Sequence, residues 1–296
     1  MKKNKISWTG KSYGGYWGTL SFALLLRVGI LPAYVLLVFV SAFFVVFRRE
    51  ACRGGILYLK RRFKNTGCIF FKIYKLVFSF GMSILDKISF FSGSGKIFCS
   101  DYCDSEIKNL LSEGRGLIVC TAHIGGWQIA GAQLSKYNRP VYVMGADMED
   151  EKVSKAAAVG GASKKLEIKG DFSEPADILS AYAALKRGEI TAMHIDRYAG
   201  GRFAEVNFLG GRAKVPIAAY VLAAKSGAPL LQVACIRERA FKYAIFHFKA
   251  MKIPRLRGQE LEKACIAAAQ TSMDNISEVL ARHPYQWFNF YDFWGE

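Results

Sequence analysis

The sequence has few acidic residues and few cysteines. Its 296 residues include 24 aspartates and glutamates against 41 lysines and arginines, which gives a formal net charge of +17. The seven cysteines are odd in number and form no dense framework, so we expect free thiols in a reducing compartment. With 52% hydrophobic and 14% aromatic residues, the chain is neither disordered nor collagen-like. Its length suits one large domain or two small ones.

Acidic residues are nearly missing from the first 75 positions. Glu50 is the single acid there, beside fourteen lysines and arginines, whereas the remaining 221 residues carry a net charge of +4. The bases surround a very apolar stretch, which indicates an anionic membrane surface rather than nucleic acid as the partner. A recognisable nucleic-acid-binding motif is also missing.

The apolar stretch covers residues 28–47 and contains no charge. Twenty apolar residues are enough to cross a hydrocarbon core of about 30 Å. The stretch is too long for a cleavable signal peptide, and no small-residue cleavage site follows. Pro32 predicts a kink near its start, and bases at both ends leave its orientation open. Three interpretations remain: a true span, a kinked helix embedded from one side, or a buried core helix.

Two further helical patterns follow. In residues 50–64, Cys52, Ile56, Leu59 and Phe63 recur at helical spacing among many bases, as in an interfacial helix or an ordinary helix with a solvated basic face. Residues 69–91 predict a second helix, lying on the membrane or roofing the next domain. Residues 92–95 predict a flexible joint. We therefore expect a membrane-anchoring helical region over 1–95 and an α/β domain over 96–296.

Strand and helix patterns alternate after residue 100. Strands are predicted at 117–121, 140–144, 190–195 and 229–236, and an antiparallel edge strand at 242–248. Helices are predicted at 127–136, 173–187, 215–226 and 258–282. Such alternation predicts an α/β fold, a mixed and mostly parallel sheet with helices on both faces, preceded by N-terminal membrane-associated helices.

A histidine at the end of the first of these strands is a candidate catalytic residue. His123 is followed by Gly125 and Gly126, and then by the helix that begins at Trp127. Ligands of open α/β sheets bind beyond the carboxyl ends of strands. The glycines would let a substrate approach the backbone, and the helix start would offer N–H donors to an oxyanion. A purely structural histidine is the alternative.

Charged residues also follow the strand at 190–195. An arginine there, Arg197 or Arg202, would suit a phosphate group, although Asp196 and its neighbours could instead form a solvated loop with a local ion pair. His194 and Asp196 could be two metal ligands, but no third ligand is evident nearby, so we expect no metal. The glycine pairs lack the spacing of a phosphate-binding or dinucleotide-binding loop.

Four blocks resemble the bacterial lipid A late acyltransferases, part of the lysophospholipid acyltransferase superfamily. Residues 121–131 (TAHIGGWQIAG) are similar to the family's His-x4-acid block, and residues 194–210 to its Asp, Gly-rich turn and Val-x-Phe-Phe-Gly segment. Residues 216–233 resemble the helix and strand that follow, and 284–294 (PYQWFNFYDFW) the Pro-x-Gln-Trp end. Tyr16-Trp17-Gly18 also fits the family's membrane-proximal start.

The resemblance implies that His123 is a general base and that Gln128 stands where the family has its acid. A glutamine can hold the imidazole ring but supplies no charge. Either Asp196, Asp147 or Glu149 replaces that acid, or catalysis is weak or lost and the protein is a lipid-binding or scaffold subunit. Gly125, Gly126, Trp127, Asp196, Arg197 and Arg202 are the implied substrate-binding residues.

The implied reaction moves a fatty acyl group from acyl-carrier protein or acyl-coenzyme A to a hydroxyl of a lipid or glycolipid. The activated thioester makes a metal or organic cofactor unnecessary. Expected partners are the lipid acceptor, acyl-carrier protein and an anionic membrane surface, without nucleic acid. The expected location is the cytoplasmic face of the inner membrane. A basic peripheral membrane protein without enzymatic activity is the alternative from another class.

Overall fold

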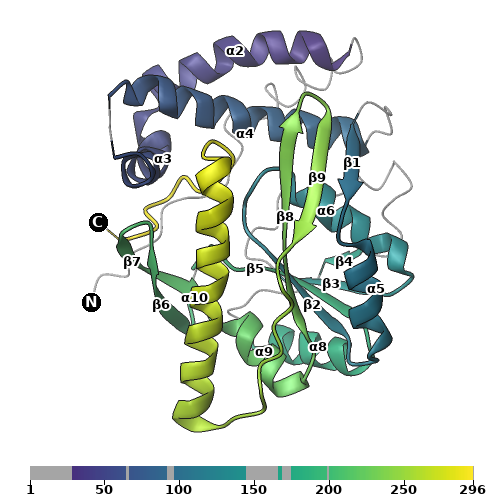
Figure 1. Ribbon diagram of the computed structural model, residues 1–296. Helices are drawn as coiled ribbons and strands as arrows, with labels where there is room; N and C mark the ends of the chain where they lie inside the picture. The colour runs from purple at the N-terminus through teal and green to yellow at the C-terminus, as the bar shows by residue number, and fades with distance from the viewer. Residues whose placement is uncertain are drawn as a thin grey trace.

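The computed structural model describes residues 29–64, 67–91, 97–144, 166–168, 175–198 and 200–295. Figure 1 shows a central sheet flanked by helices, with the N-terminal helices lying across one end. Several predictions fall on positions outside the described residues: Tyr16-Trp17-Gly18, the joint at 92–95, Asp147 and Glu149.

Three helices precede the sheet: α2 (Ile30–Phe47), α3 (Arg49–Arg62) and α4 (Ile69–Phe91). By length and composition, α2 could cross a membrane, which is consistent with membrane association. The kink predicted at Pro32 is wrong, because α2 begins at Ile30 and places Pro32 in the first turn. The backbone N–H groups of a first turn have no intrahelical acceptor, so proline costs nothing there.

The main sheet has seven strands in the order β1-β9-β8-β2-β5-β3-β4. The strands are β1 (Phe98–Asp101), β2 (Leu117–Thr121), β3 (Val141–Met144), β4 (Leu166–Ile168), β5 (Ile190–His194), β8 (Leu230–Arg239) and β9 (Lys242–His247). All neighbours pair in parallel except β8 and β9. The predicted mixed, mostly parallel sheet is confirmed. The antiparallel strand predicted at 242–248 is β9, but it is not an edge strand, because β1 pairs with its other side.

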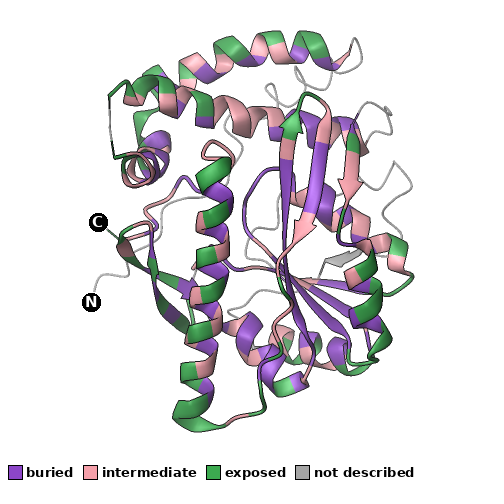
Figure 2. Cartoon of the chain, in the orientation of Figure 1, coloured by how far each residue is buried: buried purple, intermediate pink, exposed green. Residues whose placement is uncertain are grey.

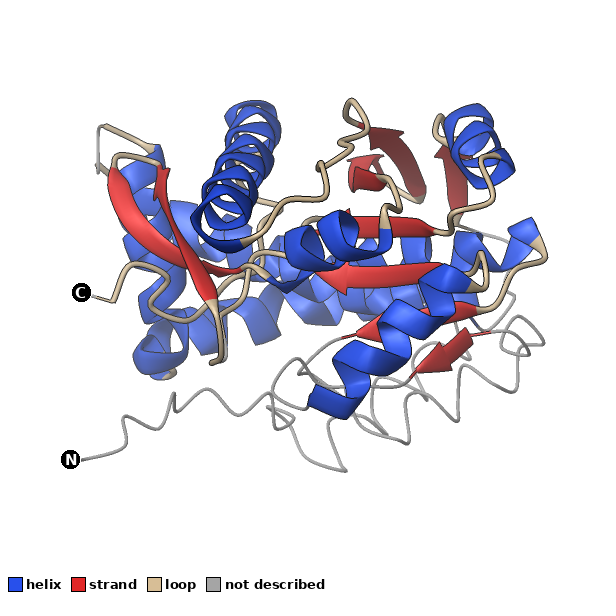
Figure 3. Ribbon diagram, turned by 90° about the horizontal axis from the view of Figure 1, so that it is seen from below, coloured by secondary structure: helices blue, strands red, loops and turns tan. Residues whose placement is uncertain are grey.

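Helices cover both faces of this sheet, as predicted (Figure 3). Alternate residues of β2 show the two sides: Ile118 and Cys120 pack with α8, α9 and α10, whereas Leu117 and Val119 pack with α5, α6 and η1. The first group is α8 (Pro175–Lys186), α9 (Ala218–Ser226) and α10 (Gly258–Arg282). The second is α5 (Asp104–Ser112), α6 (Trp127–Gln133) and the 3-10 helix η1 (Leu134–Tyr137). Figure 2 shows that the sheet is buried between them.

A separate antiparallel hairpin, β6 (Phe203–Phe208) and β7 (Gly211–Pro216), packs beside α10. The helix predicted to begin at residue 215 therefore begins later, at Ala218 of α9, because β7 extends to Pro216. Leu209 and Gly210, both with positive φ, form the two-residue turn between the strands. Leucine is an unusual residue at such a position, and the sequence pattern did not predict this hairpin.

Candidate active site

The site lies where β2 and β5 end. These strands are parallel neighbours, with Thr121 opposite His194. His123 and Asp196 each lie two positions further along, so they leave the same edge of the sheet side by side. This is the edge at which open α/β sheets bind ligands.

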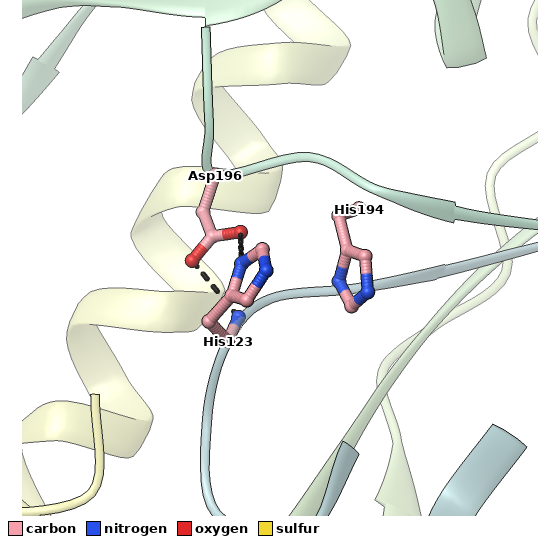
Figure 4. Close-up of side chains that lie close together, drawn as sticks. All are labelled: His123, His194 and Asp196. Atoms are coloured by element: carbon pink, nitrogen blue, oxygen red, sulfur yellow. Dashed lines mark hydrogen bonds and ion pairs between the residues drawn. The ribbon is translucent and has the colours of Figure 1, made fainter. Parts of the chain in front are cut away.

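His123 and Asp196 form a hydrogen-bonded pair (Figure 4). The His123 ring Nδ1 lies 2.8 Å from Asp196 Oδ1, and the His123 backbone N–H donates to Asp196 Oδ2 at 2.9 Å. No described residue forms a hydrogen bond with the other ring nitrogen, Nε2. An Nδ1–H donated to the carboxylate leaves Nε2 as a free base.

The Asp196 side chain is fully buried and stays ionised. Burial raises its pKa, but the charge of His123 and its hydrogen bond, with His194 and Arg197 nearby, lower the pKa well below its ordinary value. Oδ2 accepts a further hydrogen bond from the indole Nε1 of Trp287 at 2.8 Å. Three N–H donors therefore hold the carboxylate in one orientation.

Two rings surround the His123 imidazole. His194 stacks on it, with ring centroids 4.2 Å apart and planes at 25°, and Trp127 lies 5.3 Å away. Burial and the neighbouring charge of His123 hold the pKa of His194 well below 6.5, so His194 is neutral at pH 7. Its Nδ1 is buried without a hydrogen-bond partner among the described residues.

The same three residues could be considered as metal ligands. One potential ligand atom from each of His123, His194 and Asp196 lies within 4.8 Å of the others. His123 is therefore the third potential ligand beside His194 and Asp196, which was not evident from the sequence. However, both oxygens of Asp196 already accept hydrogen bonds from N–H groups. The two imidazoles stack, with ring centroids 4.2 Å apart. A histidine held by an ionised carboxylate in this way can transfer a proton.

Gln128 does not occupy the position expected from the motif. It lies in the first turn of α6, half-buried, and makes no hydrogen bond to any described residue. Asp196, 73 residues further along the chain, holds the His123 ring instead. The assignment of Gln128 as the partner of His123 was therefore wrong, because the fold brings a carboxylate from the neighbouring strand to Nδ1.

Gly125 and Gly126 are needed for packing. A Cβ on Gly125, whose φ is +55°, would lie 2.0 Å from the Cys235 carbonyl oxygen of β8, and one on Gly126 would lie 2.7 Å from the Tyr243 ring. Their N–H groups donate to the carbonyls of Gln286 and Cys235. The expectation that these two glycines lie open to a substrate is thus corrected.

The two arginines have different surroundings. Arg197 is half-buried, and its guanidinium donates to the Phe288 carbonyl at 3.2 Å. Arg202 is exposed. Burial raises the pKa of the Cys265 thiol in α10, and the charge of Arg202 opposes this rise. Asp196 was predicted both as a substrate-binding residue and as a carboxylate that could replace the missing acid, and the structure shows it as the partner of His123. Trp127 remains a candidate wall of the substrate site, because it contacts both histidines.

The C-terminal tail completes the site, and Trp287 was not among the predicted site residues. Trp287 is fully buried and bridges to Ile124, and the Phe288 N–H donates to the His123 carbonyl at 2.8 Å. Tyr58 of α3 packs edge-on against Trp287. The Pro-x-Gln-Trp block was the signal that could have identified Trp287 as a partner of the site.

Helix α4 covers the loop that carries His123. Ser83 donates to the Gly125 carbonyl at 2.7 Å, and Phe80 contacts both Phe288 and Phe290 of the tail. The site therefore lies between the sheet edge and the N-terminal helices.

Comparison with known proteins identifies the family of the chain. The family model for the bacterial lipid A biosynthesis acyltransferases matches residues 62–295, which include His123, Asp196 and Trp287. No curated protein sequence matches the chain.

Proposed function

The chain belongs to the bacterial lipid A biosynthesis acyltransferase family, and from this premise we propose that it is an active acyltransferase with His123 as its general base. The observation that carries the proposal is the hydrogen bond between His123 Nδ1 and the buried, ionised Asp196. This pair supplies the charge that Gln128 does not. A charged partner for His123 supports an active enzyme rather than an inactive member of the family.

The reaction follows from the free Nε2 of His123. This nitrogen takes the proton of an acceptor hydroxyl while the hydroxyl oxygen attacks the carbonyl carbon of an acyl thioester. Asp196 stabilises the imidazolium that forms. When the tetrahedral intermediate collapses, the carbon–sulfur bond breaks, and the thiolate takes the proton back from His123. The products are an ester and a free thiol, so atoms and charge balance without a metal or redox cofactor.

The substrates are proposed from the family and from charge. The donor is an acyl thioester of acyl-carrier protein or coenzyme A, and the acceptor is a hydroxyl of a membrane lipid or glycolipid. The excess of bases in the first 75 residues suits an acidic carrier protein and an anionic leaflet alike. Because such thioesters are cytoplasmic, we place the enzyme on the cytoplasmic face of the inner membrane.

Release of free thiol by purified protein tests this function. Wild type, His123→Ala and His247→Ala are incubated in detergent with lipid extract and each thioester in turn. His247 lies in β9 and contacts the Phe248 carbonyl, so it is a matched histidine control outside the site. We expect thiol release by wild type and His247→Ala, and a loss of at least roughly 10³-fold for His123→Ala. Equal rates for all three would contradict the proposal, and lipid binding without turnover would favour a scaffold role.

A further inference from the structure

Helix α2 is docked along its whole length on the helix that covers the site. Its buried residues recur every three or four positions from the first turn to the last: Ile30, Ala33, Leu37, Ser41 and Val45. They face α4, and a Cβ on Gly81 of α4 would lie 2.3 Å from Leu37. Figure 1 shows α2 lying lengthwise over α4.

The opposite stripe of α2 is apolar and open. Its large side chains are 42–70% exposed: Leu31, Val35, Val38, Phe39, Phe43, Val46 and Phe47. The stripe runs the length of an 18-residue helix, about 27 Å, and Figure 2 shows exposed segments all along it. A continuous apolar surface of this length marks a contact with a partner or a membrane.

A buried polar cluster fixes α2 in this position. Tyr34 of α2 donates a hydrogen bond to Asp86 of α4, which is fully buried. Arg237 and Tyr243, of β8 and β9, donate to the same carboxylate at 3.0 and 2.7 Å. Moving α2 away from α4 would remove the Tyr34 donor from a buried charge, which is costly.

This docking is incompatible with a membrane span. If α2 crossed the bilayer, α4 would lie at the same depth beside it. Helix α4 carries the buried Asp86 and also binds the Gly125 carbonyl of the active-site loop through Ser83. The charged cluster and the His123 site would then lie at the depth of the hydrocarbon, where ionised side chains are costly and irregular backbone is tolerated only when protein covers it.

The charges near α2 identify the surface that it meets. Exposed bases follow the apolar stripe directly, at Arg48, Arg49 and Arg53, and continue at Lys60 and Lys64. Glu50 is the single acid among the first 75 residues. An apolar stripe bordered by bases fits the boundary between acyl chains and anionic headgroups.

We propose that α2 lies in the plane of one anionic lipid leaflet, with the Leu31–Phe47 stripe among the acyl chains, and does not cross the membrane. The inference rests on the proposed function for the lipid acceptor, but its geometry comes from the docking of α2. The active site then lies beneath α4, on the same side of the membrane as both ends of α2.

Labelling of engineered cysteines tests the orientation. Arg27→Cys, at the last base before α2 in the sequence, and Arg48→Cys, just after it, are made separately in the Cys68→Ser/Cys99→Ser full-length protein. Sealed proteoliposomes are treated with a membrane-impermeant maleimide outside or inside. We expect both cysteines to label from the same side as each other. Labelling from opposite sides would overturn the proposal.

Binding to vesicles tests the apolar stripe. Wild type, Phe39→Asp and Leu179→Asp are mixed with phosphatidylcholine vesicles, with or without phosphatidylglycerol. Leu179, 68% exposed on α8, is the matched control. Phe39→Asp should weaken binding roughly tenfold or more, Leu179→Asp should leave it unchanged, and phosphatidylglycerol should strengthen it. Equal binding by the two variants would overturn the proposal. Neither experiment measures acyl transfer, so an enzyme without acyltransferase activity would leave both results unchanged.

Discussion

Replacing Asp196 by asparagine should change the tautomer of His123 while leaving the fold in place. Two donors, the His123 backbone N–H and the Trp287 indole, converge on Oδ2, whereas Oδ1 faces Nδ1 alone. The single carbonyl oxygen of asparagine therefore takes the Oδ2 position. Its NH₂ group then faces Nδ1 and donates to it, so the His123 proton moves to Nε2.

A histidine that is protonated at Nε2 cannot take the proton of the acceptor hydroxyl. The variant also loses the charge that stabilises the imidazolium. The equivalent aspartate-to-asparagine change in a serine protease costs about 10⁴ in kcat, and we expect a loss of roughly 10³ to 10⁴ here. The assay is thiol release at saturating thioester, with the thermal midpoint measured on the same preparation.

An Asp196→Asn protein that folds normally and keeps more than about a tenth of wild-type kcat would show that His123 does not depend on Asp196. Adding Gln128→Glu to Asp196→Asn should restore nothing, because Gln128 makes no hydrogen bond to His123.

Gln128→Ala should change kcat by less than about threefold, since the side chain orients nothing in the pair, and a hundredfold loss would contradict this. Gly125→Ala should lower the free energy of unfolding, measured by denaturant titration, by at least about 2 kcal/mol, because the added Cβ would lie 2.0 Å from a carbonyl oxygen. Gly131→Ala is the control: open space surrounds Gly131, so this change should be neutral or stabilising. The fold holds the pKa of His194 well below 6.5, so on acidification this histidine binds a proton in the unfolded chain before it does in the folded protein. The free energy of unfolding of wild type should therefore fall as the pH drops below about 6.5. The contribution of His194 to this fall is at most about 1.4 kcal/mol per pH unit. His194→Gln should remove that part of the slope, and identical slopes between pH 5 and 7.5 would contradict the assignment.

The long periodic elements could be predicted from sequence because local pattern determines them. Residues 69–91, 117–121 and 258–282 form α4, β2 and α10 with the predicted bounds. The hairpin of β6 and β7 could not, since its turn residues are Leu209 and Gly210 rather than a usual hairpin pair. The edge position of β9 was wrong because β1, far away in sequence, pairs with it.

The histidine of the site was predicted directly, and its partner Asp196 only as one of three carboxylates that could replace the missing acid. The spacing of the motif placed the acid at Gln128, within the same loop. The true partner depends on β5 lying next to β2 although β3 and β4 intervene in the sequence. One regularity was present: His123 and Asp196 each lie two positions beyond a buried strand, but sequence does not state which strands are neighbours. The Trp287 donor likewise depends on the path of the C-terminal tail.

The mass of the lipid acceptor after reaction shows directly whether the protein transfers an acyl group through His123 and Asp196. Lipid extract and acyl-carrier-protein or coenzyme A thioester carrying an isotope-labelled acyl chain are incubated with wild type, His123→Ala or Asp196→Asn. We expect a lipid heavier by one labelled acyl group with wild type, and losses of at least roughly 10³-fold with either variant. An acylated lipid formed equally well by His123→Ala would show that His123 is not the catalytic base.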